Sequence, residues 1–260
     1  MDDTSAGPPP VEASPPLGVL DAAGLGWRLL MSDFWRLWLA ALVMTAVASA
    51  VGCFGLPAAI LVQPPLAAGL FYVIRRRIDG GRAKVGDLFA GFKERFGESV
   101  VGYLPVSLGS IVFGMVIGLA TWLLMMACFG VAAAAEGDDE AVAVVAAAGV
   151  VTFLMIEFFL ILALSIFCLF FFFVPLAVWD HPGSGWEAAK ASARLVRDHF
   201  LSMLGLLALF WLISAAANLV GMLACCVGWI ITVPAVMVWF YATLVYLYRS
   251  WTGSTIINVK

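Results

Sequence analysis

Two polar side chains stand inside long apolar runs of this sequence, where a polar group needs a specific reason. Glu157 is the one ionisable residue well inside such a run, and Asn218 is a carboxamide in another. Charge in hydrocarbon is costly, so ionisable residues at that depth are functional candidates. One interpretation of Glu157 is a carboxylate that binds a solute or relays a proton. The other, which we favour because its apolar run is overlong, is a residue near the outer headgroups or paired with Asn218 or an indole.

Cysteines offer a second kind of chemistry. Four of the five lie where the outer surface is expected, at Cys53, Cys128, Cys225 and Cys226, while Cys168 is placed in mid-membrane and expected to be inert. Cysteine is a small apolar residue that suits tight helix packing, and we favour that role. A disulfide between hairpins is the alternative, because an oxidising outer compartment permits one, and redox or metal chemistry is a third. The adjacent Cys225 and Cys226 are not expected to pair with each other.

Metal and cofactor chemistry have little support. His181 lies in a predicted turn and His199 at the foot of a predicted helix, whereas a metal site needs several convergent ligands. The sequence holds no glycine-rich phosphate loop and no His-Glu-x-x-His or Gly-x-Ser-x-Gly element. Ser184 and Glu187 have the spacing of a capping box, which begins a helix. We therefore expect no catalytic residue, metal or cofactor, and a protein that is not an enzyme.

The elements that position these residues are membrane helices. Hydrophobic residues make up 63% of the chain and charged residues only 12%, against about a quarter in soluble proteins. All Lys and Arg fall in four clusters, at 28–36, 75–95, 190–197 and 249–260, separated by apolar gaps long enough to cross a bilayer and return. Because positive charge collects on the cytoplasmic side, the pattern predicts three helical hairpins in a bacterial inner membrane, with both termini cytoplasmic.

The predicted fold is therefore an all-α polytopic membrane protein with six transmembrane helices. The expected spans are 35–54, 56–75, 100–131, 141–178, 200–224 and 228–249. The middle two exceed the roughly 20 residues that one crossing needs. Four carboxylates lie between them, at Glu136, Asp138, Asp139 and Glu140. Unpaired carboxylates avoid hydrocarbon, so we expect the stretch 131–151 to project above the outer surface.

The chain also repeats itself. Leu20–Ala23 aligns with Trp186–Ala189, cysteine–glycine turns recur between paired helices, and prolines recur in the second helix of each pair. Apolar positions follow helical spacing before each hairpin, so we predict interfacial amphipathic helices at 20–34, 85–97 and 185–199. The pseudo-repeats are 20–78, 84–178 and 183–250, within a membrane domain at 19–250. Residues 1–18, proline-rich and acidic, are a predicted disordered cytoplasmic tail, and 251–260 a second cytoplasmic tail.

Several of these segments carry a family resemblance. Pro65–Gly69, Arg75–Arg77, Gly86–Phe92 and Val174–Ser192 resemble motifs of bacterial multi-pass membrane proteins of unknown function. They are also similar to the membrane domain fused ahead of some glycerophosphodiester phosphodiesterases. The resemblance covers most of residues 20–250 and implies a six-helix membrane domain without established chemistry. The phosphodiesterase activity is not expected here, because no residues remain to build its catalytic domain.

A basic cluster adjoins the second predicted helix. Arg75, Arg76, Arg77 and Arg82 are candidate contacts for anionic lipids on the cytoplasmic side, where each basic residue contributes about 1 kcal/mol. The alternative is that they only enforce topology. Nucleic acid is a poor candidate, because the cluster is fixed at a membrane surface and mixed with acidic residues.

Three functional classes follow. A non-catalytic scaffold or partner subunit fits best, with the lipid bilayer and other membrane proteins as partners. A transporter or lipid-handling protein is the alternative, and would need a polar or hydrophobic cavity between hairpins and a dependence on Glu157 in a polar site. A membrane enzyme fits least, because it needs convergent His, Asp or Cys at one depth.

Overall fold

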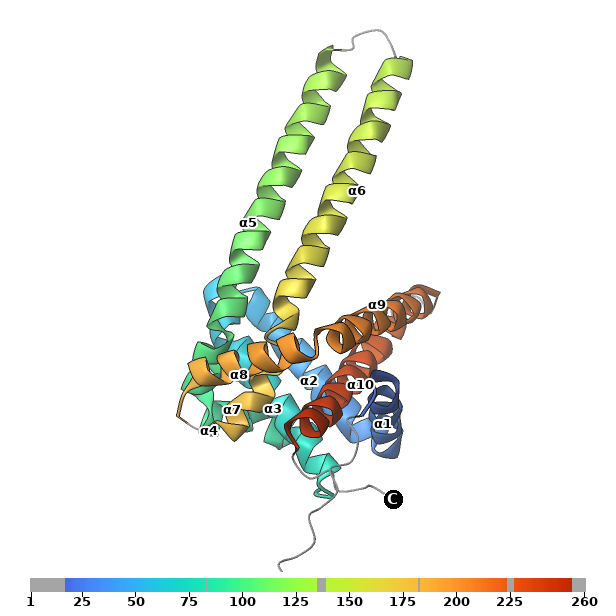
Figure 1. Ribbon diagram of the computed structural model, residues 1–260. Helices are drawn as coiled ribbons and strands as arrows, with labels where there is room; N and C mark the ends of the chain where they lie inside the picture. Colours follow the sequence, from blue (N-terminus) through green and yellow to red (C-terminus); the bar gives the residue numbers. More distant parts are fainter. Residues whose placement is uncertain (1–16, 83, 135–138, 182, 224–226, 254–260) are drawn as a thin grey trace, which may run out of the picture.

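The computed structural model describes residues 17–82, 84–134, 139–181, 183–223 and 227–253, and in these ranges the chain is helical with no β-strand (Figure 1). The helices are α1 (Val19–Ser32), α2 (Phe34–Gly52), α3 (Leu56–Ile78), the 3-10 helix η1 (Val85–Phe89), α4 (Ala90–Glu94), α5 (Phe96–Ala134), α6 (Asp139–Leu169), α7 (Val174–Asp180), α8 (Gly185–Asp198), α9 (Phe200–Leu223) and α10 (Val227–Thr252).

Six helical segments are long and apolar enough to cross a membrane. They are Phe34–Gly52, Leu56–Ile78, Phe96–Ala127, Ala147–Asp180, Phe200–Leu223 and Gly228–Thr252. The sequence-based prediction of an all-α, multi-pass membrane protein with six such segments is confirmed at this level. The observed segments match the predicted spans to within several residues at most ends.

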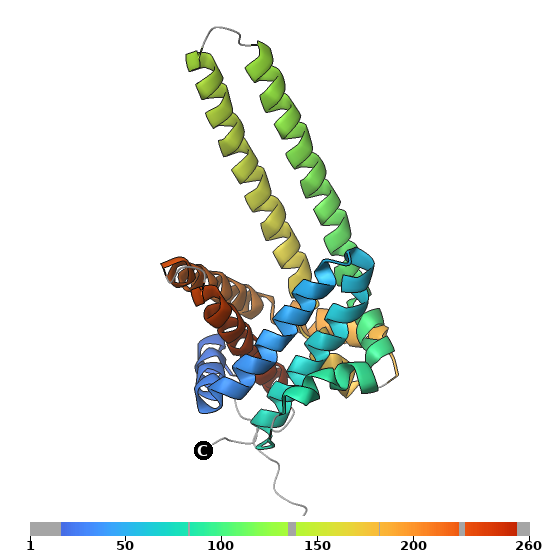
Figure 2. The same ribbon diagram turned by 180° about the vertical axis from the view of Figure 1, so that it is seen from behind.

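Helices that follow one another along the chain pack together: α2 on α3, α5 on α6, and α9 on α10. The α5–α6 pair stands apart from the rest of the molecule, and only its lower end meets the other helices (Figures 1 and 2). With 39 and 31 residues, these two helices are about 58 and 46 Å long at 1.5 Å per residue. The hydrocarbon core of a bilayer is about 30 Å thick. Projection of 131–151 stays a prediction, and residues 135–138 lie outside the described part of the chain.

The single helix predicted over 141–178 is wrong in one respect, because it is interrupted. α6 ends at Leu169 and α7 begins at Val174. Pro175 has no N–H and its ring crowds the preceding turn, which breaks a helix. The break is a tight turn in which the Phe171 amide donates to the Cys168 carbonyl at 2.9 Å.

One serine from another helix stabilises this break. The Ser192 hydroxyl, fully buried on α8, donates to the Phe170 carbonyl at 2.8 Å and accepts from the Phe173 amide at 3.2 Å. Buried backbone groups that lack a partner are costly. Ser192 therefore satisfies the polar groups that the interruption frees.

The three segments predicted to be amphipathic, 20–34, 85–97 and 185–199, are largely helical. The middle one is divided between η1, α4 and the first residues of α5, and Asp87 begins it by accepting the Lys84 amide at 3.0 Å. Each segment packs on helices of another pair: α1 on α10, η1 and α4 on α3, and α8 on α5 and α7.

Glycines permit these contacts. A Cβ at Gly91 would overlap the Pro65 carbonyl oxygen of α3, and a Cβ at Gly185 would overlap the Glu98 carbonyl oxygen of α5. Gly26 allows α1 a similar approach to Thr243 of α10. At the same α1–α10 contact, the Trp239 indole of α10 donates to the Ala23 carbonyl at 3.0 Å.

The most enclosed helices are α3 and α10. More than half of the most apolar 18-residue stretch of each is buried inside the molecule, whereas none of the corresponding stretch of α5 is. Their buried side chains, among them Leu66, Phe71, Ile74, Val238 and Val245, belong to one core cluster that also includes α1, α2 and α9 residues. The rest of the chain is arranged around this centre.

Candidate functional site

Three consecutive arginines at the end of α3 reach three different segments. The Arg75 guanidinium contacts Asp180 of α7 at 2.7 Å, and that of Arg76 contacts Asp87 of η1 at 2.9 Å. Arg77 lies 3.3 Å from Asp33, between α1 and α2, without the alignment of a hydrogen bond. A fourth pair joins Arg249 of α10, whose side chain is 7% exposed, to Asp79 at 2.6 Å. We call these eight residues the charged cluster.

The charged cluster bears on the predicted lipid contacts. Arg75, Arg76 and Arg77 each have a carboxylate partner on another segment of the chain, so their ion pairs connect these segments. Arg82 is exposed and has no ion pair among the described residues. Lipid contact by these four arginines stays a prediction, and Arg82 is the one whose charge is left available for it.

Glu157 lies on the face of α6 that meets α5. Its Oε1 is 3.2 Å from the Thr121 hydroxyl, which also donates to the Ile117 carbonyl at 2.8 Å. Glu157 does not line either of the two largest cavities described below. The structure thus pairs it with a hydroxyl on the neighbouring helix and does not bring it to Asn218.

The cysteines are only partly described. Cys53 has an exposed free thiol 3.6 Å from the Ser49 carbonyl. Cys225 and Cys226 lie outside the described residues, as does the side chain of Cys128. The disulfide therefore stays a prediction. Cys168 is free and forms part of a cavity wall.

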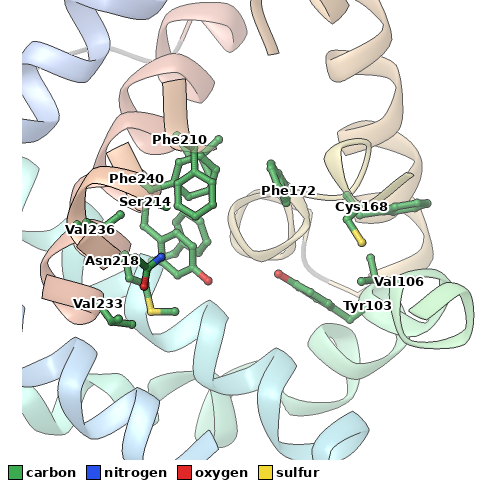
Figure 3. Close-up of a pocket in the computed structure, with 16 residues that line it drawn as sticks. Tyr103, Val106, Cys168, Phe172, Phe210, Ser214, Asn218, Val233, Val236 and Phe240 are labelled. Carbon is green, nitrogen blue, oxygen red and sulfur yellow. The ribbon is translucent and has the colours of Figure 1, made fainter. Parts of the chain in front are cut away.

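A cavity of about 480 Å³ lies where the three helix pairs meet (Figure 3). Its walls come from α3, α5, α6, the turn after α6, α9 and α10. They are mostly aromatic and aliphatic, formed by Phe71, Tyr103, Val106, Cys168, Phe171, Phe172, Phe210, Ser214, Ala217, Asn218, Val233, Val236, Met237, Phe240, Tyr241 and Leu244. Small-molecule sites in proteins have this size and character.

The polar groups of this cavity are few and uncharged. Tyr103 lies on one wall with its hydroxyl toward the interior, and the Asn218 carboxamide lies on the opposite wall with Ser214 nearby (Figure 3). Tyr241 adds a second phenol. Within the described part of the chain, the Tyr103 and Tyr241 hydroxyls and the Asn218 carboxamide have no hydrogen-bond partner.

A second cavity of about 400 Å³ adjoins the first. The two share Tyr103, Val106, Met237 and Tyr241 as walls, and the second extends toward α2. Its polar lining is again uncharged and comes from Gln63, Ser107 and Ser110 in addition to the tyrosines.

A metal centre has no basis in the described residues, where no group of three or more His, Cys, Asp or Glu could hold an ion. His199 stacks on Trp251 with ring centres 4.2 Å apart. Ser184 caps α8 by accepting the Glu187 amide at 3.2 Å, which is one of the two hydrogen bonds of the predicted capping box; the reciprocal bond to the Glu187 side chain is not among the hydrogen bonds of the described residues.

Of the cavity residues, sequence reasoning singled out only Asn218. Tyr103, Ser214 and Tyr241 were missed as site residues. One signal was available for α9: Phe210, Ser214 and Asn218 are four residues apart and share a helix face. No comparable signal links Tyr103 to Tyr241, because they belong to different pairs.

Fold and site together define a multi-pass, all-helical membrane protein with an uncharged internal cavity. The chain belongs to the family described as a domain of unknown function, DUF7847, which matches residues 18–259. No curated protein and no solved structure matches the chain. The comparisons show no link to glycerophosphodiester phosphodiesterases, so that resemblance stays a hypothesis.

Proposed function

We propose that the six segments form three transmembrane hairpins in a bacterial inner membrane, with both termini cytoplasmic and α1, η1–α4 and α8 on the inner face. The clustering of every Lys and Arg supports this topology. The charged cluster adds support, because it gathers the ends of α3, α7 and α10 with η1 at one end of the molecule.

Within this frame, we propose that the protein is a non-catalytic scaffold that holds other membrane helices on its α5–α6 pair. The observation that supports this proposal is that the α5–α6 pair is exposed beyond its contact with the other helices. Large apolar side chains on it are between 57% and 70% exposed, namely Met115, Leu119, Trp122, Leu154 and Phe158. No other described helix covers them.

Glycines on α5 indicate where another helix would approach. A Cβ at Gly109 would overlap the Phe167 ring of α6, so that glycine is used within the pair. Gly114 and Gly118 have nothing within 4 Å of an added Cβ. Glycine costs about 0.5–1 kcal/mol relative to alanine in a helix, and small residues four apart allow close contact of membrane helices.

We propose that the helix that packs on this face of α5 belongs to a second copy of this chain. Two α5 helices would present identical small-residue faces, and identical faces are self-complementary about a two-fold axis. The face carries no charge, so two copies can approach without repulsion.

Two differently tagged full-length copies, expressed together and solubilised in mild detergent, test this proposal. The tagged copies should purify together, and Gly114→Leu with Gly118→Leu should reduce the co-purified copy by about tenfold, because the larger side chains prevent the close approach of the two helices. Gly205→Leu, at an equally open and exposed glycine of α9, is the matched control and should have no effect. Wild-type copies that do not purify together, or an equal loss with Gly205→Leu, would contradict self-association.

A transporter that depends on Glu157 has less support, because Glu157 contacts Thr121 and lines no described cavity. The cavity at the meeting point of the helix pairs favours the lipid-handling part of that alternative.

A further inference from the structure

We propose that the 480 Å³ cavity binds an uncharged, chain-bearing lipid whose head carries carbonyl oxygens. This inference is independent of the scaffold function, because the cavity is lined by Tyr103 and Val106 near the start of α5 and by α3, α9, α10 and the turn after α6, and does not involve Gly114 and Gly118 on the exposed face of α5.

The unsatisfied polar groups are the first argument. The Tyr103 and Tyr241 hydroxyls, on half-buried side chains, line an otherwise apolar cavity and have no hydrogen-bond partner within the described residues. The Asn218 carboxamide, on an exposed side chain, stands at the same cavity and is also without a partner there. A hydroxyl among apolar side chains gains free energy from a hydrogen-bond partner, which a ligand can supply. A bound head with carbonyl oxygens would accept hydrogen bonds from all three.

The lining also has a direction. Along one face of α9, Phe210 is followed by Ser214, Ala217 and Asn218, so polarity increases toward the end of the helix near Leu223. Asn218 is exposed, and Val233 beside the same cavity is 41% exposed, which places the opening there. Aromatic rings, including Phe172, Phe210 and Phe240, line the part of the cavity away from this opening (Figure 3). A lipid would enter chain first and keep its head at the Asn218 end.

Charge selects the class of lipid. No Lys, Arg, Asp, Glu or His lines either cavity. An ionised headgroup at this depth would be desolvated without a counter-ion, which is strongly unfavourable. Diacylglycerols and prenyl quinones both combine carbonyl oxygens with apolar chains and carry no charge, whereas phosphatidylglycerol is anionic.

The second cavity suggests how two chains would fit. Because the two cavities share Tyr103, Val106, Met237 and Tyr241, a lipid held at the tyrosines could place one chain in each. Diacylglycerol would use both cavities, and a quinone with a single chain would use one.

Photolabelling of the full-length protein in lipid nanodiscs tests the proposal. A diacylglycerol with a photoreactive chain should label peptides of α9 and α10, and unlabelled diacylglycerol or prenyl quinone should compete. Competition by one of these alone supports the proposal and identifies the source of the carbonyl group. Phosphatidylglycerol with the same chains should compete at least tenfold less well. Equal competition by phosphatidylglycerol, or no competed labelling of these peptides, would overturn the proposal.

Two variants locate the site. Ala217→Phe should fill the cavity and reduce competed labelling at least tenfold, while Ala216→Phe, at the exposed neighbouring position of α9, should leave it unchanged. Asn218→Leu keeps the volume and removes the polar contact, and should weaken competition roughly two- to tenfold, the range of one net hydrogen bond. If Ala217→Phe does not fold, Asn218→Leu still tests the proposal. Equal labelling in wild type and Asn218→Leu would overturn the assigned orientation of the head.

Discussion

At the scale of single residues, the polar side chains of this membrane protein mainly form hydrogen bonds with groups on its own helices. Ser192 forms two hydrogen bonds with the backbone of the break before α7, in addition to the turn's own backbone bonds. Thr121 on α5 provides a neighbour for Glu157. Such structural roles are hard to distinguish from functional roles by sequence, because a serine or a carboxylate within an apolar run can serve either one.

Removal of the Ser192 hydroxyl should therefore destabilise the fold. Ser192→Ala leaves the buried Phe173 amide and the Phe170 carbonyl without their partner, and an unsatisfied buried group costs about 1–3 kcal/mol. The measurement is the free energy of unfolding in mixed micelles titrated with denaturing detergent. Ser49→Ala, at an exposed serine of α2, should change it by less than about 0.5 kcal/mol. Similar values for both variants would show that the hydroxyl does not stabilise the break.

At the scale of elements, glycines fix how closely the short helices approach the long ones. Gly91→Ala should push α4 away from α3, because the added Cβ would overlap the Pro65 carbonyl, which is backbone and cannot rotate aside. Overpacking of this kind costs about 1–3 kcal/mol. Thermal unfolding of the purified protein would measure the loss. Gly86→Ala, in the same segment but with open space around its Cβ, should melt close to wild type, and an equal loss there would point to backbone flexibility instead.

Elements were also the scale at which the sequence was most informative. Long apolar runs and amphipathic spacing locate the six membrane segments and the short helices, because both signals are local. The break at 170–173 depends on Pro175 together with Ser192 of a distant helix, so the proline alone could not locate it. The cavity could not be predicted at all, since Tyr103 and Tyr241 come together only when α5 and α10 pack.

At the scale of the whole molecule, ion pairs connect the helix pairs to one another and to the short helices. Arg75, Arg76 and Arg77 contact α7, η1 and the α1–α2 junction, and Arg249 adds α10. Sequence reasoning assigned these arginines to lipid or topology. Asp87 is only eleven positions from Arg76, but the partners of Arg75, Arg77 and Arg249 lie on distant segments, and no local pattern in the sequence predicts those pairs.

Topology can be tested directly at this scale. Reporter fusions after Glu140 should read outside, whereas fusions after Gly80, after Gly185 and at the C-terminus should read inside, because all Lys and Arg lie on the proposed inner side. The pairing of an alkaline phosphatase and a fluorescent protein reporter gives opposite signals at each position. A cytoplasmic signal after Glu140 would contradict the three-hairpin arrangement.

The contact of α1 with α10 has a consequence for biosynthesis. α1 is the first described helix to leave the ribosome and α10 is the last, yet Trp239 and Thr243 of α10 cover Ala23 and Gly26 of α1. The Leu17 amide also donates to the Ser250 hydroxyl at 2.7 Å. α1 also contacts α2 and α9, but its main packing partner is α10, so most of this contact forms only after α10 has entered the membrane. A nascent chain that stops before residue 227 lacks α10, so we expect it to leave the Ala23 and Gly26 face of α1 uncovered.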